Sequence, residues 1–263
     1  MIVAGFDQRD FTMLKNLFVM TLKDRFLGSG LGLMWAVLSP LMMMGIFVFV
    51  FTFVFPGRLA GQEGALPFVI WLISGYGPWL ALSEGLNSST GSVAANAGIV
   101  KNIAFKSELL PMVGAMLGIV PLFVSFAILL VLKFIAGQIP GAAVLLLPFS
   151  ILLMLTFVSG VGFFLSSLNV FVRDVSLALP NILMAFLFAS PIFYPITAYP
   201  AVLQNVLQFN PFYVLAEFFR APILNNELPP LWMFVYMMTL SGLLFIGGLR
   251  WFRRLKSFFD VRL

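Results

Sequence analysis

The chain has 263 residues, of which 61% are hydrophobic and 10% are charged, and its mean hydropathy is +1.06. A soluble domain ordinarily carries about 25% charged residues, so this composition excludes one and predicts an all-α, multi-pass membrane protein. The formal net charge is +5, but the basic residues flank apolar stretches, so we expect membrane lipids rather than nucleic acid as their partner.

The sequence has no cysteine and no histidine. This excludes disulfides, thiolate chemistry, imidazole metal ligands and a histidine general base. The acidic residues are few and scattered, so we predict no catalytic residue, no metal site and no cofactor bound by this chain.

The first predicted element is an amphipathic helix within residues 1–32. Its apolar residues recur at helical spacing, with polar residues gathered on another side, which is typical of a helix lying along a membrane surface. The apolar stripe consists of Phe11, Leu14, Phe18 and Leu22.

A transmembrane domain is expected over residues 33–263. Six spans are predicted at about 33–55, 66–86, 109–132, 142–168, 177–194 and 229–249. Each is expected to cross a hydrocarbon core of roughly 30 Å.

The uncharged run from Val175 to Ala216 is long enough for two crossings, but five prolines interrupt it. We interpret it as one span followed by short re-entrant helices near 202–209 and 212–219. Such backbone must be shielded by protein or line a water-filled cavity.

Basic residues predict the orientation of the chain. With six spans and the N-terminus inside, only Arg58, Lys133 and Arg220 of the 15 Lys and Arg residues fall outside. The positive-inside rule therefore places both termini in the cytosol. If residues 175–216 crossed twice, the basic cluster at 250–256 would lie outside, which the same rule disfavours.

The segment that leads into the first span carries a recognisable pattern. Its matching residues are Leu22–Phe26, Gly28–Gly32, Met34-Trp35 and Ser39-Pro40. This pattern resembles the N-terminal motif of the ABC-2 permeases that export bacterial polysaccharides: O-antigen, capsule and teichoic acid. Phe26 stands where tyrosine is usual, and Gly30 adds a second glycine before Leu31.

Residues near the start of this motif are candidates for the place where substrate enters. Lys23 and Arg25 are expected at headgroup depth, where they could meet a lipid pyrophosphate or simply anchor the chain. Trp35 belongs to the same motif. Glu84, near the inner end of the second span, is either a functional intramembrane acid or an interfacial one.

The loop between the second and third predicted spans contains a short apolar stripe. Val100 and Ile103 are spaced as on one face of a helix, which would suit docking on a partner, although a plain interfacial connector is the alternative. The resemblance implies that this is the coupling helix that enters an ATPase cleft, with Asn96, Lys101 and Phe105 as matching residues.

The turn after the fourth span carries the adjacent charges Arg173 and Asp174. Without the resemblance it is a solvated turn. The resemblance implies that it lies close to the ATPase and that both residues are contact residues.

The proline-rich segment carries two further motifs. Ser190-Pro191 and Asn210-Pro211, with Arg220 after them, resemble family elements, and the alternative is that these prolines only kink helices. The run contains more prolines than are needed to end or kink its helices, so we prefer a gate near the outer face.

Aromatic residues suit passage of sugars, whose C–H faces can lie against a ring. The resemblance implies an aromatic lining, although lipid contact and core packing explain most of the 31 phenylalanines, including those that alternate from Phe47 to Phe55. The candidates for the lining are Phe51, Phe188, Phe193 and Tyr194.

The chain contains no G-x-x-x-x-G-K-[ST] nucleotide loop, so we expect ATP and Mg²⁺ to bind a separate subunit. The resemblance implies a homodimer of inner-membrane permeases joined to two ATPase subunits, exporting lipid-linked polysaccharide, with O-antigen preferred. One alternative is an ABC-2 exporter of teichoic acid, capsule, drug or lipid. Another is an integral-membrane glycosyltransferase, which would need converging carboxylates.

Overall fold

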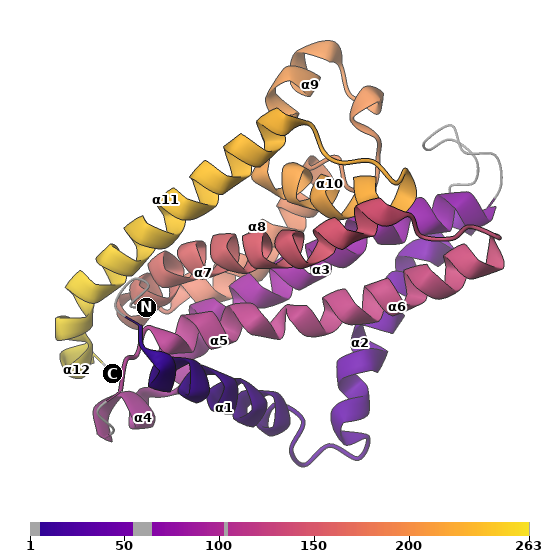
Figure 1. Cartoon of the computed structure of the whole chain (residues 1–263). Helices are drawn as coiled ribbons and strands as arrows, with labels where there is room; N and C mark the ends of the chain where they lie inside the picture. Colours follow the sequence, from indigo (N-terminus) through magenta and orange to yellow (C-terminus); the bar gives the residue numbers. More distant parts are fainter. Residues whose placement is uncertain (1–5, 55–64, 103–104, 263) are drawn as a thin grey trace.

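The structure is a computed structural model that describes residues 6–54, 65–102 and 105–262. The regular elements of these ranges are helices, drawn in chain order in Figure 1. The α-helices are α1 (Gln8–Asp24), α2 (Trp35–Phe49), α3 (Ala65–Ala95), α4 (Ala97–Asn102), α5 (Leu109–Leu117), α6 (Ile119–Ile135), α7 (Leu147–Phe171), α8 (Asp174–Ala189), α9 (Ala201–Leu207), α10 (Pro211–Leu224), α11 (Leu231–Leu255) and α12 (Phe259–Arg262).

Five helical stretches in the described residues are long and apolar enough to cross a membrane. They are Gly32–Val54, Leu66–Ala95, Leu109–Ile135, Ala142–Phe171 and Leu231–Phe258. Each corresponds to one of the predicted spans. The second is longer than predicted, because α3 continues beyond residue 86 to Ala95.

The fifth predicted span, at 177–194, coincides largely with α8, which has 16 residues. At 1.5 Å per residue this helix is roughly 24 Å long, shorter than a hydrocarbon core. The helix ends at Ala189, and Ser190 has extended backbone because Pro191 follows it. A membrane crossing by α8, which would bring the number of spans to six, therefore remains a prediction. The segments predicted to be re-entrant contain the helices α9 and α10, and their depth in a membrane also remains a prediction.

Helix α1 begins with a capping box. The Asp7 carboxylate accepts hydrogen bonds from the backbone N–H groups of Arg9 at 3.0 Å and Asp10 at 3.2 Å, and the Asp10 carboxylate accepts one from Asp7 N–H at 2.8 Å. After α1, Gly28 and Gly32 have φ of +80° and +53°. Glycine adopts such backbone without strain, which explains Gly28 and Gly32 of this motif.

The apolar stripe of α1 is rotated from the predicted one. Leu17 is buried, with Met13, Leu14 and Phe18 packed around the same cluster, whereas Phe11 is exposed. The reason is that α1 lies against α5 and buries the face that meets that helix.

Helix α3 lies at the centre of the bundle and contacts α5, α6, α7 and α10. Small residues permit close approach: a Cβ on Gly114 would lie 2.4 Å from Ser89 N, and one on Gly118 would lie 2.1 Å from Ala81 O. Membrane helices commonly pack through such positions. The most hydrophobic part of α3 is 72% buried, against 17% for the stretch containing α2.

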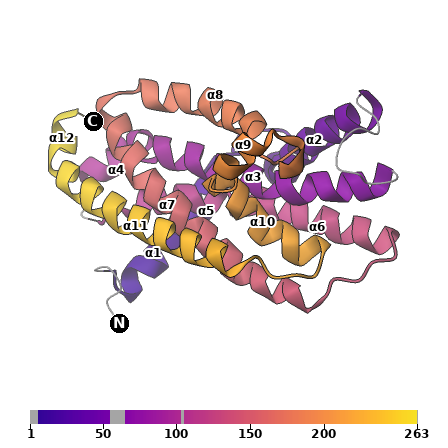
Figure 2. The same ribbon diagram turned by 90° about the horizontal axis from the view of Figure 1, so that it is seen from above.

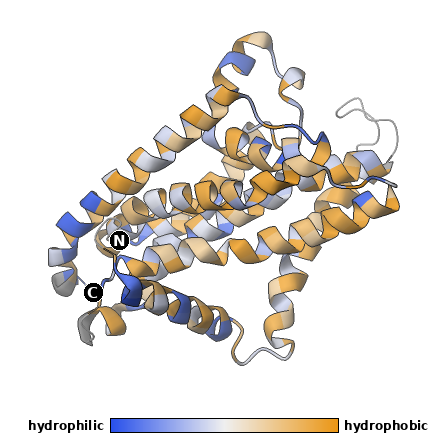
Figure 3. Ribbon diagram, in the orientation of Figure 1, coloured by the Kyte–Doolittle hydropathy of each residue, from blue (hydrophilic) through white to orange (hydrophobic). Residues whose placement is uncertain are grey.

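The start of α1, helix α4 and the C-terminal end of α11 lie at the same end of the bundle (Figure 1), where Asp10 and Arg253 both pair with residues just before α5. Seen from above, α11 runs along α7, and α8 and α2 extend to the side of the bundle away from α11 (Figure 2). Hydrophilic residues gather on α1 and at the C-terminal end of α11, and hydrophobic ones dominate α6 and α7 (Figure 3).

Candidate functional site

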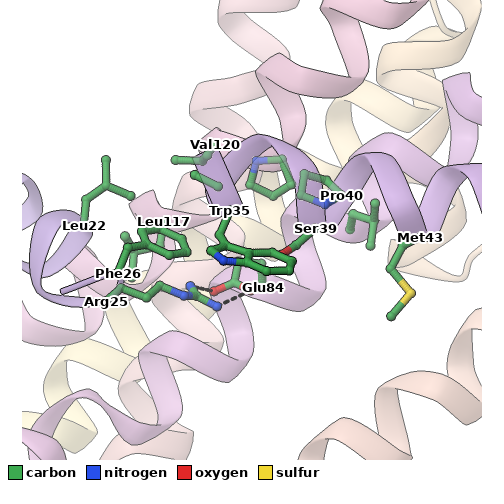
Figure 4. A pocket seen from close by; sticks show the side chains of 13 residues that line it. Leu22, Arg25, Phe26, Trp35, Ser39, Pro40, Met43, Glu84, Leu117 and Val120 are labelled. Carbon is green, nitrogen blue, oxygen red and sulfur yellow. Dashed lines mark hydrogen bonds and ion pairs between the residues drawn. The ribbon is translucent and has the colours of Figure 1, made fainter. Parts of the chain in front are cut away.

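An inner groove of about 250 Å³ lies where the end of α1 meets α2, α3 and the α5–α6 junction. Most of its lining is apolar, and its charged residues are Arg25 and Glu84. Figure 4 shows the Arg25 guanidinium pointing at the Glu84 carboxylate, with the Trp35 indole beside them. The groove thus combines an apolar wall with a charged pair, a composition that suits an amphiphilic ligand.

Arg25 and Glu84 form a two-pronged ion pair. Arg25 Nη1 contacts Glu84 Oε1, and Nη2 donates to Oε2 at 3.2 Å. Ser88 Oγ also donates to Glu84 Oε1 at 2.7 Å. Planar, two-pronged geometry is the stronger form of an arginine–carboxylate contact. Arg25 is therefore attached to α3.

Of the three residues predicted where substrate enters, Arg25 and Trp35 line the groove. Lys23 is exposed in the last turn of α1 and is not among the lining residues. The Arg25–Glu84 pair was not predicted from the sequence, because the two residues were considered separately. The signal was present as an acid inside an apolar helix, which usually has a basic partner.

A second site is an aromatic cluster, defined here as Phe47, Phe51, Tyr76, Phe188, Phe193 and Tyr194. Phe193 is at its centre and is fully buried. Its ring centroid lies 5.1 Å from that of Phe51 and 5.7 Å from that of Phe188. Tyr194 joins through Phe51, at 6.0 Å. The predicted lining residues therefore form one group.

Phe47 and Tyr76 belong to this cluster but were not among the predicted lining residues. Their ring centroids lie 4.6 Å and 5.4 Å from that of Phe193. Phe47 and Phe51 are four residues apart and share a face of the first stretch, whereas Phe49 and Phe53 are exposed. Helical phase within the alternating phenylalanines was the usable signal.

The two proline motifs are joined by side chains. Asn210 Nδ2 donates to Ser190 Oγ at 2.8 Å, and Asn210 Oδ1 accepts from Phe212 N–H at 2.9 Å. Asn210 thus caps α10, with Pro211 in the first turn. The end of α8 and the start of α10 are held together beside the aromatic cluster.

Arg220 of α10 fixes the turn that carries Phe193. Its Nη2 donates to the Ile192 carbonyl at 2.9 Å, and Nη1 pairs with Glu217 Oε1 at 2.7 Å. The guanidinium also lies over the Trp71 ring, 4.5 Å from the ring centroid. A buried charge is tolerable only with such partners.

The predicted coupling segment contains α4. Asn96 separates α4 from α3, and the Asn96 carbonyl accepts a hydrogen bond from Val100 N–H at 3.0 Å. Val100 and Phe105 pack partly against an apolar cluster that includes Leu109. Ile103 and the side chain of Lys101 lie outside the described part of the chain.

Arg173 and Asp174 are exposed at the junction of α7 and α8. Hydrogen bonds between backbone and side-chain groups order the junction: Ser176 N–H donates to Asn169 Oδ1 at 3.1 Å, and Ser176 Oγ donates to the Arg173 carbonyl at 2.9 Å. The turn therefore presents both charged side chains on a defined scaffold.

Two ion-pair groups near the termini were not predicted. Glu108 accepts from Arg253 at 3.1 Å and Lys256 at 3.2 Å, and Lys106 contacts Asp10 at 2.5 Å. Burial raises the pKa of Glu108, but its backbone hydrogen bond and the two basic side chains outweigh burial and lower the pKa below its usual value. These contacts attach α1 and the C-terminal end of α11 to the start of α5.

The long apolar helices define a multi-span integral membrane protein. Hydrophilic residues gather on α1 and at the C-terminal end of α11 (Figure 3). The sequence profile of the ABC-2 type transporter family matches residues 12–224, and the chain belongs to this family. It is accordingly a transport component and not an enzyme.

Several curated proteins are similar along most of their length. An O-antigen export system permease protein RfbA of Klebsiella pneumoniae is 26% identical over 237 residues, which is 89% of this chain and 88% of that protein. An RfbA of Myxococcus xanthus is 26% identical over 219 residues, 82% of each chain. The polysialic acid transport protein KpsM of Escherichia coli is 25% identical over 226 residues, 84% of each chain.

Proposed function

We propose that this chain is the permease subunit of an ATP-driven exporter that moves lipid-linked polysaccharide, with O-antigen as the favoured cargo, from the cytosol to the periplasm. The observation that carries the proposal is the similarity to permeases named for O-antigen and polysialic acid over more than four-fifths of each chain. The chain is expected in the inner membrane, with both termini in the cytosol.

The inner groove is the proposed place where the lipid end of the glycan enters. Its apolar wall suits a lipid chain, and Arg25 suits a pyrophosphate because guanidinium groups bind phosphate oxygens in pairs. Arg25 is already held by Glu84, so a phosphate would share or displace that carboxylate. Trp35 offers an amphipathic ring at the same place, as is common at membrane interfaces.

A second copy of the chain is the proposed partner along α2 and α8. Exposed apolar side chains on these helices flank the aromatic cluster. They include Met42, Ile46, Phe49 and Met184. Two copies that meet there would enclose a passage between two aromatic clusters. Because the chain has no cysteine, single-cysteine variants such as Met42→Cys should form disulfide-linked dimers in membranes, and exclusively monomeric chains at every α2 and α8 position would contradict this arrangement.

Two ATPase subunits are the proposed partners at the end of the bundle that holds the termini. Helix α4 and the Arg173–Asp174 turn are the contact candidates there, with ATP and Mg²⁺ bound by the partners. Closure of the ATPases would push these segments and open the aromatic cluster beneath the Ser190 to Arg220 region. Each hydrolysis cycle would then advance the glycan.

Complementation tests this function. A strain that lacks its polysaccharide exporter should regain surface polysaccharide when it receives this chain together with an ATPase subunit. Glycan that stays in the cytosol with both proteins present in the membrane fraction would contradict the proposal. Glycan transfer to an acceptor by the purified chain in liposomes without ATP would instead favour a glycosyltransferase.

A further inference from the structure

A second cavity, of about 380 Å³, is lined by elements that lie away from α4 and α12 (Figure 1). Its wall is built from the start of α3, the turn after α6, the turn at Pro195-Ile196 and helix α10. This volume lies in the range of small-molecule sites and has room for one or two sugar rings.

We propose that this outer cavity is a saccharide-binding pocket that the glycan occupies as it leaves the aromatic cluster. The inference rests on the proposed export function. It adds a defined binding site on this chain and the residues that form it. The residues that carry it are Trp71, Gln138, Tyr213, Glu217, Arg220 and Asn225.

The chemistry of this wall suits sugar hydroxyls. A carboxylate accepts hydrogen bonds, a guanidinium donates them, and the two side-chain amides and the phenol do both. The Tyr213 ring, which is partly exposed, adds a flat surface for the C–H face of a sugar. Among the described residues, the charged ones that line the cavity are Glu217 and Arg220, which are paired with each other at 2.7 Å. The charges nearly balance, which favours a neutral, hydroxyl-rich ligand over an anionic headgroup.

Arg220 offers a specific contact for such a ligand. The side chain is only 6% exposed, and its Nε atom has no hydrogen-bond partner among the described residues. An unmatched buried donor is unfavourable, and a hydroxyl in the cavity would satisfy Nε once the Arg220 side chain shifts toward it. Gly75 leaves room for this guanidinium, because a Cβ at residue 75 would lie 1.8 Å from Nη2.

The pocket adjoins the gate. Arg220 holds the Ile192 carbonyl at 2.9 Å, and the next residue, Phe193, is the centre of the aromatic cluster. A sugar bound by Glu217 or Arg220 would therefore sit directly beyond Phe193. Such a site would keep the glycan from sliding back while the aromatic cluster closes behind it.

Cysteine protection in cells tests the proposal. Gln138→Cys places a thiol in the wall of the pocket, and Ile139→Cys is the matched control, since residue 139 is 82% exposed and does not line the cavity. The chain otherwise has no cysteine. Each variant is expressed with an ATPase subunit, in a strain that makes the glycan and in one that lacks glycan synthesis. A membrane-impermeant methanethiosulfonate reagent then labels the thiol from outside.

Labelling of Gln138→Cys should be at least about threefold slower in the glycan-producing strain, as expected for a site at least two-thirds occupied. Ile139→Cys should label at the same rate in both strains. Equal rates for Gln138→Cys, with normal surface polysaccharide, would overturn the pocket while leaving the export function intact. Equally slow labelling in both strains would mean that a lipid headgroup fills the cavity, and would also overturn it. Absence of surface polysaccharide would instead count against the export function.

Substitution of Glu217 tests the chemistry. Glu217→Gln keeps the length of the side chain but removes its charge, and should abolish the protection of Gln138→Cys. Glu227→Gln is the control, because residue 227 is exposed and does not line the pocket. Retained protection in Glu217→Gln, with unchanged amounts of the chain in the membrane, would overturn the assignment of this residue.

Discussion

Reversing the charges of Arg25 and Glu84, singly and together, separates two roles of the inner groove. Hydrogen bonds to charged groups contribute about 1.5–3 kcal/mol when they are buried. The Arg25 and Glu84 side chains are 44% and 26% exposed, and exposed ion pairs contribute only about 0.2–1 kcal/mol. The two-pronged geometry places this pair near the upper end, so we expect a coupling free energy of about 1 kcal/mol.

Thermal unfolding in detergent measures this energy through a double-mutant cycle. Arg25→Glu and Glu84→Arg should each lower Tm by roughly 2–4 °C per kcal/mol lost, and the double variant should recover most of the loss. Export should behave differently if Arg25 meets the lipid pyrophosphate: the double variant places a carboxylate at position 25 and should stay inactive. A coupling energy near zero would refute the structural role, and full export by the double variant would refute the phosphate-binding role.

Three further predictions concern the other sites. Phe193→Ala should lower the free energy of unfolding by about 3–5 kcal/mol, because residue 193 is fully buried. Phe188→Ala, at a half-exposed position, should lower it much less. Similar losses in Tm for the two variants would contradict the central place of Phe193. The pKa of Glu108 is lowered in the folded chain, so its contribution to stability is complete above the unfolded value of about 4.5 and disappears as pH falls through the folded value. Glu108→Gln should therefore flatten the fall of Tm as the pH drops below about 4.5, and an unchanged profile would count against the cluster with Arg253 and Lys256. Arg173→Glu with Asp174→Arg should leave stability within about 0.5 kcal/mol, since both side chains are exposed, yet should reduce copurification of the ATPase subunit; undiminished copurification would remove this turn from the contact.

The sequence was a good guide to most of the long helices, whereas the span predicted at 177–194 extends beyond the end of α8 at Ala189. Apolar runs with charges at their ends predict α3, α6, α7 and α11, because length and hydropathy alone decide whether a helix can cross a membrane. For α8 the same uncharged run contains Ser190-Pro191, and the proline ends the helix after 16 residues. A hydropathy average does not reveal where a proline ends a helix.

The candidate sites were also predicted only in part: the motif residues were identified, but their partners were not. Ser190 and Asn210 were each predicted as gate candidates from the family resemblance, and the structure joins them by a hydrogen bond that was not predicted. The partners that complete each site come from distant helices: Glu84 for Arg25, Tyr76 for Phe193, and Trp71 for Arg220. Such partners depend on how the helices pack, which neither periodicity nor spacing determines. Phe11 and Leu17 show the same limit, since contact with α5 selected the buried face of α1.

Reconstitution tests the central claim most directly. The purified chain is placed in liposomes with lipid-linked glycan, with or without an ATPase subunit and ATP, and glycan on the far side of the membrane is measured. We predict translocation only when chain, ATPase and ATP are all present. Translocation or glycan transfer by the chain alone, or nucleotide hydrolysis by the chain without a partner, would contradict the account.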